Sequence, residues 1–347
     1  MILPGSAAIT LALFILSMIC LGSWASTYKL CSKWRWELYY FDFAFGLVAA
    51  ALIAAFTFGS LGFDGFSFTD DFLHAGKKQI LFVFAAGAIF NLANMLIMAA
   101  ISIGGMAVAI PISLSIAAAI GIVASYLTTA AGNVVLLFSG ALVLLVSVVF
   151  AAVSYRNHAE IKLLQLIEAG LAKSTKKKIS MKAVTLSVFG GIILGGFTPV
   201  LQLGQGGDIG LGPYSSTVIA ALGVLVSALV LNLFFMNLPV EGEPVEVTDY
   251  FRAPLALHMK GMLGGALWAI GLTSAAVAAI AEGETKFPPA FGFAFGQGAV
   301  LVAVFWGLLV WKDFDSWDAR VKTTTGLTVV LFIIGSAIAT AGIMLAH

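Results

Sequence analysis

Ten apolar stretches constrain this chain more than any other feature, because each is long enough to cross a lipid bilayer. They lie at residues 7–27, 38–58, 79–101, 106–127, 134–153, 183–204, 214–236, 261–281, 288–311 and 324–345. About 20 apolar residues in a helix cross a hydrocarbon core of about 30 Å, since each residue adds about 1.5 Å. Only 10% of the residues are charged, against about 25% in soluble proteins. The sequence predicts an all-α integral membrane protein with ten transmembrane helices.

The distribution of basic residues predicts the orientation of these helices. If the loops alternate sides, one side holds fifteen of the 18 Lys and Arg residues, and the other holds only Lys77, Lys78 and Lys286. Basic residues gather in cytoplasmic loops, so we expect a multi-pass protein of the inner or plasma membrane with its central loop in the cytoplasm and both termini outside. The fifteen are Lys29, Lys33, Arg35, Arg156, Lys162, Lys173, Lys176, Lys177, Lys178, Lys182, Arg252, Lys260, Lys312, Arg320 and Lys322.

Short similarities between distant segments indicate that the chain consists of two related halves. The sequence separation between the paired segments is nearly constant in three places. The alternative is a chance resemblance among helices rich in Gly and Ala. The similar pairs are LGSWA at 21–25 with LGGFT at 194–198 (offset 173), GAIF at 87–90 with GALW at 265–268 (offset 178), and Pro111 with Pro289 (offset 178).

The repeat predicts how the chain is organised. We expect a first five-helix half at 1–153, a basic cytosolic connector at 154–182 and a second five-helix half at 183–347. Because five is an odd number, the two halves would cross the membrane in opposite senses. Such inverted repeats are typical of secondary transporters, whose substrates bind near the midplane between the halves.

Two asparagines, Asn91 and Asn94, lie in the middle of the apolar stretch at 79–101. Their spacing of three residues places both amides on one helix face. A buried amide without a hydrogen-bond partner costs roughly 2 to 7 kcal/mol, so a partner is expected. Polar groups at this depth mark either a transport pathway or hydrogen bonds between helices, and both interpretations stay open.

Further candidates for a substrate site lie near the middle of other stretches. Gln297 is central in the ninth stretch, and Ser113 follows Pro111, whose missing N–H is expected to bend or open the fourth helix near that point. Aromatic rings at matching or related repeat positions are candidates for stacking on a planar or sugar-like ligand, although packing is the alternative. These positions, with one neighbouring hydroxyl, are Trp24, Phe197, Thr198 and Trp268.

Two carboxylates, Glu37 and Asp42, begin the second stretch, and Asp42 lies about 6 Å further into it than position 38. A proton-coupled carrier needs a titratable group of this kind. The alternative is a cap on the helix or an ion pair with Lys29, Lys33 or Arg35.

Several other chemistries find no support in the sequence. GLAKST at 170–175 has Ala172 before Lys173, where a phosphate-binding loop requires glycine. We expect no enzymatic activity, no metal, no cofactor and no nucleic-acid partner, with a proton or sodium gradient as the energy source. The histidines are far apart in predicted loops or at the terminus, which disfavours a metal site: His74, His158, His258 and His347.

One family shares these features. The segment from WRWELYYFDFAFG through FTFGSLG, followed by FNLANMLIMAAISIGGMAVAIPI, resembles bacterial relatives of the plant ureide permeases. These belong to the drug/metabolite transporter superfamily, together with glucose/ribose porters and rhamnose–proton symporters. The resemblance implies proton-coupled uptake of allantoin or related oxo-heterocycles such as uracil and xanthine. The plant proteins also carry a nucleotide-loop-like motif in the central loop, which this sequence lacks.

We therefore expect a secondary active transporter that imports a small neutral polar solute by alternating access, working as a monomer or homodimer in the lipid bilayer. The amides of Asn and Gln pair a donor with an acceptor, which matches the edge of a ureide or nucleobase. Sugars bind to the same groups, so a pentose or hexose porter is the alternative within the class. An intramembrane enzyme or a structural membrane protein is the alternative outside it.

Overall fold

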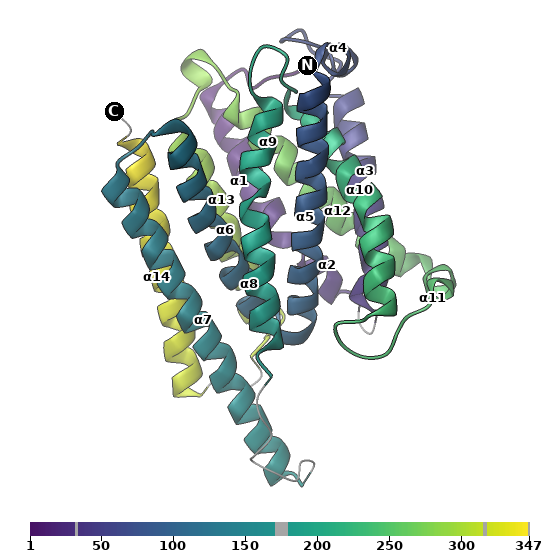
Figure 1. The fold of residues 1–347 in the computed structure, drawn as a ribbon, viewed down its shortest axis with the longest axis vertical. Helices are drawn as coiled ribbons and strands as arrows, with labels where there is room; N and C mark the ends of the chain where they lie inside the picture. Colours follow the sequence, from purple (N-terminus) through teal and green to yellow (C-terminus); the bar gives the residue numbers. More distant parts are fainter. Residues whose placement is uncertain (32–33, 171–179, 315–317, 346–347) are drawn as a thin grey trace.

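The structure, a computed structural model, describes residues 1–31, 34–170, 180–314 and 318–345 as a bundle of long helices (Figure 1). Before the central connector the helices are α1 (Ala7–Ser23), α2 (Ser26–Lys29), α3 (Trp36–Phe56), α4 (Phe68–His74), α5 (Lys77–Gly104), α6 (Met106–Thr129) and α7 (Val134–Glu168). After it come α8 (Lys182–Gly195), α9 (Phe197–Gln205), α10 (Pro213–Asn237), α11 (Val247–Arg252), α12 (Leu255–Ala279), the 3₁₀ turn η1 (Gly283–Thr285), α13 (Pro289–Phe305), the π-helix η2 (Trp306–Val310) and α14 (Ala319–Met344).

Ten helical segments among the described residues are long and apolar enough to cross a membrane, which confirms the predicted fold class and number of spans. We number the spans one to ten in chain order. Span one consists of α1 and α2, span six of α8 and α9, and span nine contains α13 and η2. The short helices α4 and α11 lie in the connections between spans.

Spans one and six are interrupted at matching repeat positions. In span one, α1 ends at Ser23 and α2 begins at Ser26; in span six, α8 ends at Gly195 and α9 begins at Phe197. Both breaks fall inside the similar segments LGSWA and LGGFT. Broken helices of this kind recur in transporters built from inverted repeats. Pro111 does not interrupt α6, because it lies in the second turn, where its ring removes only the hydrogen bond to Ala107.

The spans pack into two bundles. Bundle A consists of spans three, four and six (α5, α6, α8 and α9), and bundle B of spans one, eight and nine (α1, α2, α12, α13 and η2). Span two packs against span seven, and span five against span ten. Replacing each span by its counterpart five spans away converts bundle A into bundle B and maps the other two pairs onto themselves. The inverted repeat remains a prediction, which this packing pattern supports.

The two ends of the bundle differ in their connections. Both chain termini and α4 lie at one end, which we call the terminal end (Figure 1). The opposite, basic end carries α11 and the described Lys and Arg residues of the predicted cytoplasmic loops. Helix α7 continues through the predicted boundary at residue 153 as far as Glu168, and residues 171–179 of the predicted connector lie outside the described part.

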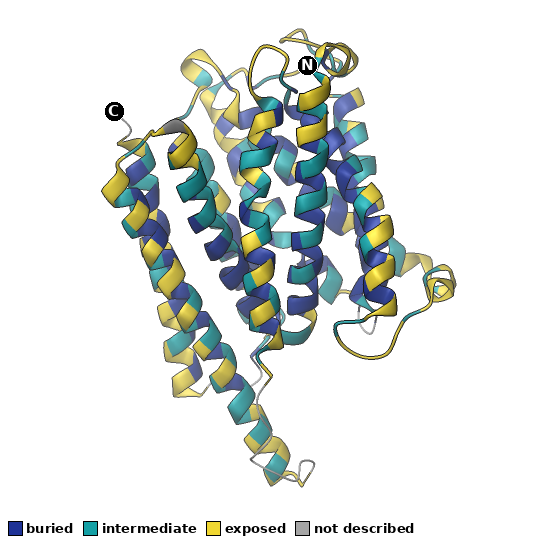
Figure 2. Cartoon of the chain, viewed as in Figure 1, coloured by how far each residue is buried: buried dark blue, intermediate teal, exposed yellow. Residues whose placement is uncertain are grey.

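The basic-end half of α3 is buried on all sides. Every residue from Trp36 to Ala44 is buried, and these include the fully enclosed side chains of Tyr39, Tyr40 and Phe43. Figure 2 shows such buried positions concentrated inside the bundle, with exposed residues along its outer faces. A helix that is buried on all sides lies in a protein core. Any polar group on this stretch must therefore find its partner within the protein.

Candidate substrate pathway and coupling site

Asn91 lies at the middle of α5, fourteen residues after Lys77 and thirteen before Gly104. Its side chain is completely buried, and neither its nitrogen nor its oxygen has a hydrogen-bond partner among the described residues. Asn94, one turn further on, is also buried, but its Nδ2 donates a hydrogen bond of 3.1 Å to the Tyr40 hydroxyl on α3. The two amides therefore differ: Asn94 joins two helices, whereas Asn91 is left unpaired.

Three aromatic rings meet at the same depth and connect the two bundles. The rings of Phe90 on α5 and Trp268 on α12 have centroids 4.1 Å apart. Phe197, at the start of α9, lies 5.6 Å from Phe90 and 6.3 Å from Trp268. Phe90 and Trp268 are the matching positions of GAIF and GALW. The structure thus brings together two of the three predicted aromatic residues, Phe197 and Trp268, beside a third ring that the sequence analysis did not select.

The other predicted site residues make different contacts. Trp24 is buried against Phe43, with ring centroids 5.2 Å apart, and Thr198 is exposed. The Ser113 hydroxyl donates to the carbonyl of Ala109 in its own helix, at a surface that packs against α8.

Gln297 lies in a part of α13 that is accessible on all sides. Its Oε1 is buried without a partner in the described structure, yet no residue from Phe291 to Gly298 is classed as buried. A helix face packed against a neighbour buries about one residue in each turn, so this half of α13 is loosely packed. The rings of Phe295 and Phe14 stack there, with centroids 5.6 Å apart, but such contacts do not bury any residue of this half. Helix α5 is not among the close packing partners of α13, and no hydrogen bond joins the Gln297 oxygen to Asn91 in the described structure.

The same contrast appears in α6, the repeat counterpart of α13. All residues at 106–113, near the basic end, are buried, whereas none at 123–128, near the terminal end, is buried. In α13, the basic-end residues Ala299, Val300, Ala303 and Val304 are buried. These two helices are therefore more deeply buried near the basic end than near the terminal end.

Asp42 is the centre of a polar cluster at the basic end. It is 2% exposed, and its Oδ1 accepts a hydrogen bond of 2.6 Å from the Tyr250 hydroxyl on α11. His258, in the first turn of α12, places Nδ1 2.9 and 3.1 Å from the two carboxylate oxygens. Trp34 packs edge-on against the His258 ring. Burial raises the pKa of the Tyr250 hydroxyl, and the hydrogen bond to Asp42 raises it further, so Tyr250 stays a donor.

This cluster corrects the expectation that the histidines lie in loops. His258 belongs to α12 and contacts the carboxylate that the sequence analysis proposed for coupling. Among the described residues, the imidazole of His258 is the ionisable basic group that contacts Asp42, and neither Lys29 nor Arg35 pairs with it; Lys33 lies outside them. The sequence could not reveal this pairing, because it depends on the packing of α3 against α12.

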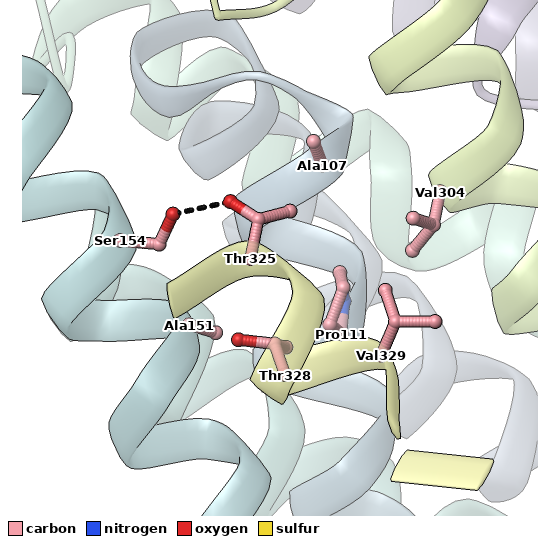
Figure 3. A pocket seen from close by; sticks show the side chains of 8 residues that line it. All are labelled: Ala107, Pro111, Ala151, Ser154, Val304, Thr325, Thr328 and Val329. Atoms are coloured by element: carbon pink, nitrogen blue, oxygen red, sulfur yellow. Dashed lines mark hydrogen bonds between the residues drawn. The ribbon is translucent and has the colours of Figure 1, made fainter. Parts of the chain in front are cut away.

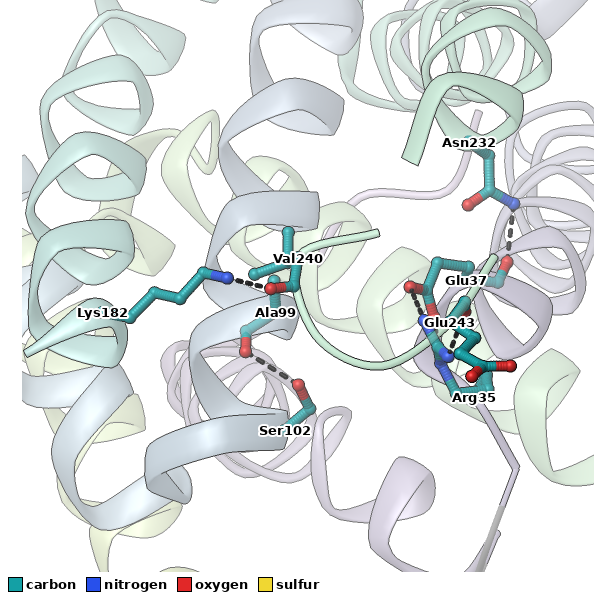
Figure 4. A network of polar contacts seen from close by, with 8 residues as sticks. All are labelled: Arg35, Glu37, Ala99, Ser102, Lys182, Asn232, Val240 and Glu243. Carbon is teal, nitrogen blue, oxygen red and sulfur yellow. Dashed lines mark hydrogen bonds and ion pairs between the residues drawn. The ribbon is translucent and has the colours of Figure 1, made fainter. Parts of the chain in front are cut away.

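Glu37 forms the ion pair with Arg35 that was one alternative for both carboxylates. Its side chain is fully buried and takes two bonds from Arg35, of 2.6 Å at Oε1 and 3.1 Å at Oε2. Asn232 on α10 donates to the backbone carbonyl of Glu37. Figure 4 shows this network and the nearby segment that contains Val240 and Glu243, whose carbonyls accept from Lys182 and Arg35 respectively. These contacts fix the basic ends of α3, α8 and α10.

A small cavity between α6, α7, α13 and α14 is lined by Pro111, Ser154 and Thr325, among others (Figure 3). Its volume for a water-sized sphere is about 10 Å³, which is about the minimum for one water molecule. The hydroxyls of Ser154 and Thr325 lie 2.6 Å apart across it. The cavity is too small for an organic solute. Within the described residues, no group of three His, Cys, Asp or Glu side chains is placed to hold a metal ion.

The ten apolar spans define a multi-pass membrane protein, and comparison with known proteins indicates a transport protein. The ureide permease family model matches residues 39–188, which run from α3 into α8 and include Asp42, Asn91 and Asn94. Ureide permease 1 of Arabidopsis thaliana is 22% identical over 378 residues, covering 94% of this chain and 95% of the relative. Ureide permeases 2 and 4 of the same plant are each 23% identical, over 389 and 398 residues, and cover 95% and 96% of both chains.

These matches confirm the predicted resemblance: the chain is similar to ureide permeases, by the family model over residues 39–188 and by three relatives over most of its length. The relatives are named as permeases, so the comparison also supports the prediction that the protein is a transporter and not an enzyme.

Proposed function

We propose that this protein is a secondary active transporter that imports a small neutral polar solute by alternating access, with a ureide such as allantoin or a nucleobase such as uracil or xanthine as its substrate. The observation that carries this proposal is the Asn91 side chain, which is buried at the midplane without a partner. A polar group in that position costs roughly 2 to 7 kcal/mol. A bound solute that supplies the missing hydrogen bonds removes this cost.

The surroundings of Asn91 fit a flat, polar molecule. The amide offers one donor and one acceptor side by side, and a ureide or nucleobase edge presents the complementary N–H and C=O groups. The neighbouring residue Phe90 belongs to the ring cluster with Trp268 and Phe197. Aromatic faces cover the flat faces of such ligands. The names of the relatives favour ureides within this class.

Proton coupling is assigned to Asp42, with His258 and Tyr250 as its partners. Asp42 belongs to the first half of the chain, whereas Tyr250 and His258 belong to the second. An ionised Asp42 accepts hydrogen bonds from both partners, and a protonated Asp42 loses part of this capacity. A proton at this cluster therefore changes a contact between the two halves, which is what coupling to a proton gradient requires.

Transport by purified protein in proteoliposomes tests the proposal. Counterflow is measured with labelled allantoin, uracil, xanthine, ribose and glucose, with protein-free liposomes as the control. We expect trapped unlabelled ureide or nucleobase to drive uptake of the labelled compound. Counterflow with ribose or glucose alone would establish the sugar-porter alternative, and absence of counterflow with all five would contradict the proposal.

A further inference from the structure

Asp313 connects the two bundles at the basic end. It follows η2 in bundle B, and its side chain is only 1% exposed. Its Oδ1 accepts a hydrogen bond of 2.9 Å from Lys29 Nζ, at the end of α2 in bundle B. Its Oδ2 accepts a bond of 3.0 Å from the backbone N–H of Ala107, in the first turn of α6 in bundle A. A single buried carboxylate thus holds both bundles.

Two glycines allow this close approach. Gly105, directly before α6, has a φ of 81°, and a methyl group on it would lie 2.6 Å from Asp313 Cγ. A methyl group on Gly307 in η2 would lie 2.7 Å from the backbone nitrogen of Ala107. The backbones of the two bundles therefore touch around the carboxylate. Asp313 also lies at the positive end of the α6 dipole, which adds to the attraction of Lys29.

The opposite ends of the same two helices are less buried. Residues 123–128 of α6 and 291–298 of α13 are all accessible, whereas the ends that meet at Asp313 are buried. The two helices thus pack tightly at the basic end and are more accessible at the terminal end. A carrier that works by alternating access must also adopt the reverse arrangement, in which α6 and η2 separate at the basic end.

We propose that Asp313 is the positioning residue of the gate at the basic end, where its carboxylate holds α6 against η2 and Lys29 keeps that carboxylate in place. This inference rests on the proposed alternating-access function. The contact is suited to repeated opening, because a carboxylate and an ammonium group that separate at a water-filled opening become hydrated. A solute bound between bundle A and bundle B can then leave at the basic end only after the Asp313 contacts break.

Cysteine accessibility in membrane vesicles tests the gate. Cys20 and Cys31, both buried, are first replaced by serine. One reporter cysteine is placed at Val304, which is buried near the gate, and another at Ala294 in the accessible half of α13. A membrane-permeant maleimide then reports how often each end is open. The gate variants are Asp313→Asn, whose amide oxygen still accepts from the Ala107 N–H but carries no charge, and Lys29→Met.

We expect both variants to raise the labelling rate at position 304 about fivefold and to lower it at position 294, because loss of a partly exposed ion pair shifts the two states by about this factor. Opposite changes at the two positions distinguish a gate from general loosening, which would raise both rates. Lys29→Arg should keep the wild-type pattern. Asp318→Asn, which removes an exposed carboxylate paired with Arg320, is the matched control and should also change neither rate.

Labelling of the protein with Asp313 intact, with and without solute, distinguishes failure of this inference from failure of the proposed function. Allantoin or uracil should shift the labelling of positions 294 and 304 in opposite directions when Asp313 is present. If that shift occurs but Asp313→Asn changes neither rate, or raises both, Asp313 is not the gate. If no condition gives opposite shifts, alternating access itself is contradicted.

Discussion

The basic end and the midplane of the bundle both bury polar side chains, but they differ in how those side chains are paired. At the basic end, Asp42, Glu37 and Asp313 each accept hydrogen bonds of 3.1 Å or less. At the midplane, Asn91 and the Oε1 atom of Gln297 have no partner in the described structure. Burial alone therefore does not mark the substrate site. The three basic-end carboxylates are paired without a ligand, although Asn232 Oδ1 and Trp311 Nε1 have no partner in the described structure; at the midplane, both polar atoms of Asn91 are unpaired.

This difference in pairing assigns the gate and the proton site to the basic end and the substrate site to the midplane. Paired groups at the basic end hold helices together and are expected to act as gate or proton site when a pair breaks. Unpaired groups at the midplane are available to a solute. The following predictions test this division, beginning with the largest expected effect.

Asp42→Asn should abolish uphill uptake driven by a proton gradient and leave counterflow intact. The amide keeps the size of the carboxylate but does not titrate, and exchange of solute needs no net movement of protons. Uptake and counterflow are measured in the same proteoliposomes. His258→Gln should lower uphill uptake in the same way. Asp249→Asn, an exposed carboxylate on α11, is the control and should accumulate solute normally; normal accumulation by Asp42→Asn would place coupling elsewhere.

Glu37→Gln should lower the free energy of unfolding by about 1 to 3 kcal/mol while leaving counterflow per folded protein unchanged. Breaking a buried pair costs more than this, but Arg35 is 30% exposed and water compensates part of the loss. Unfolding in detergent measures the change. Glu160→Gln removes an exposed pair with Arg156 and should cost about 0.5 kcal/mol or less. Loss of proton coupling in a stable Glu37→Gln protein would assign Glu37 to the proton site instead.

Trp268→Leu should raise the apparent KM about three- to tenfold, because a stacked aromatic ring contributes about 0.5 to 1.5 kcal/mol beyond its buried area. Initial rates of uptake against substrate concentration give the value. Trp24→Leu provides a matched control, since the ring contact of Trp24 is with Phe43 and its loss should affect stability more than KM. Equal effects of the two variants on KM would extend the site to span one.

Asn94→Leu should cost about 1 kcal/mol of stability, because it leaves the Tyr40 hydroxyl without its partner in the core. Tyr40→Phe should have a similar cost, and the double variant should cost less than the sum of the two single changes. Thermal unfolding of the four proteins completes the cycle. Strict additivity would show that this hydrogen bond does not stabilise the packing of α3 on α5.

Properties that depend on position along a span were predictable from the sequence. The ten spans follow from apolar length, and the midplane depth of Asn91 follows from its distance to both ends of α5. Properties that depend on direction around a helix axis were not predictable. Hydropathy does not show that Asp42 faces His258, or that Gln297 lies on a helix that does not pack against α5. The breaks in spans one and six coincide with the repeated segments, a signal that the sequence did contain.

The most direct test of the central claim is the thermal stability of Asn91→Leu with and without ligand, compared with Asn94→Leu. Without ligand, Asn91→Leu should be at least as stable as the wild type, because it removes a buried polar group that has no partner. With allantoin or uracil, it should lose ligand-induced stabilisation on the order of 1 to 3 kcal/mol, whereas Asn94→Leu should lose stability in both conditions. An Asn91→Leu protein that is destabilised without ligand but stabilised by ligand as strongly as the wild type would contradict the claim that Asn91 binds the substrate.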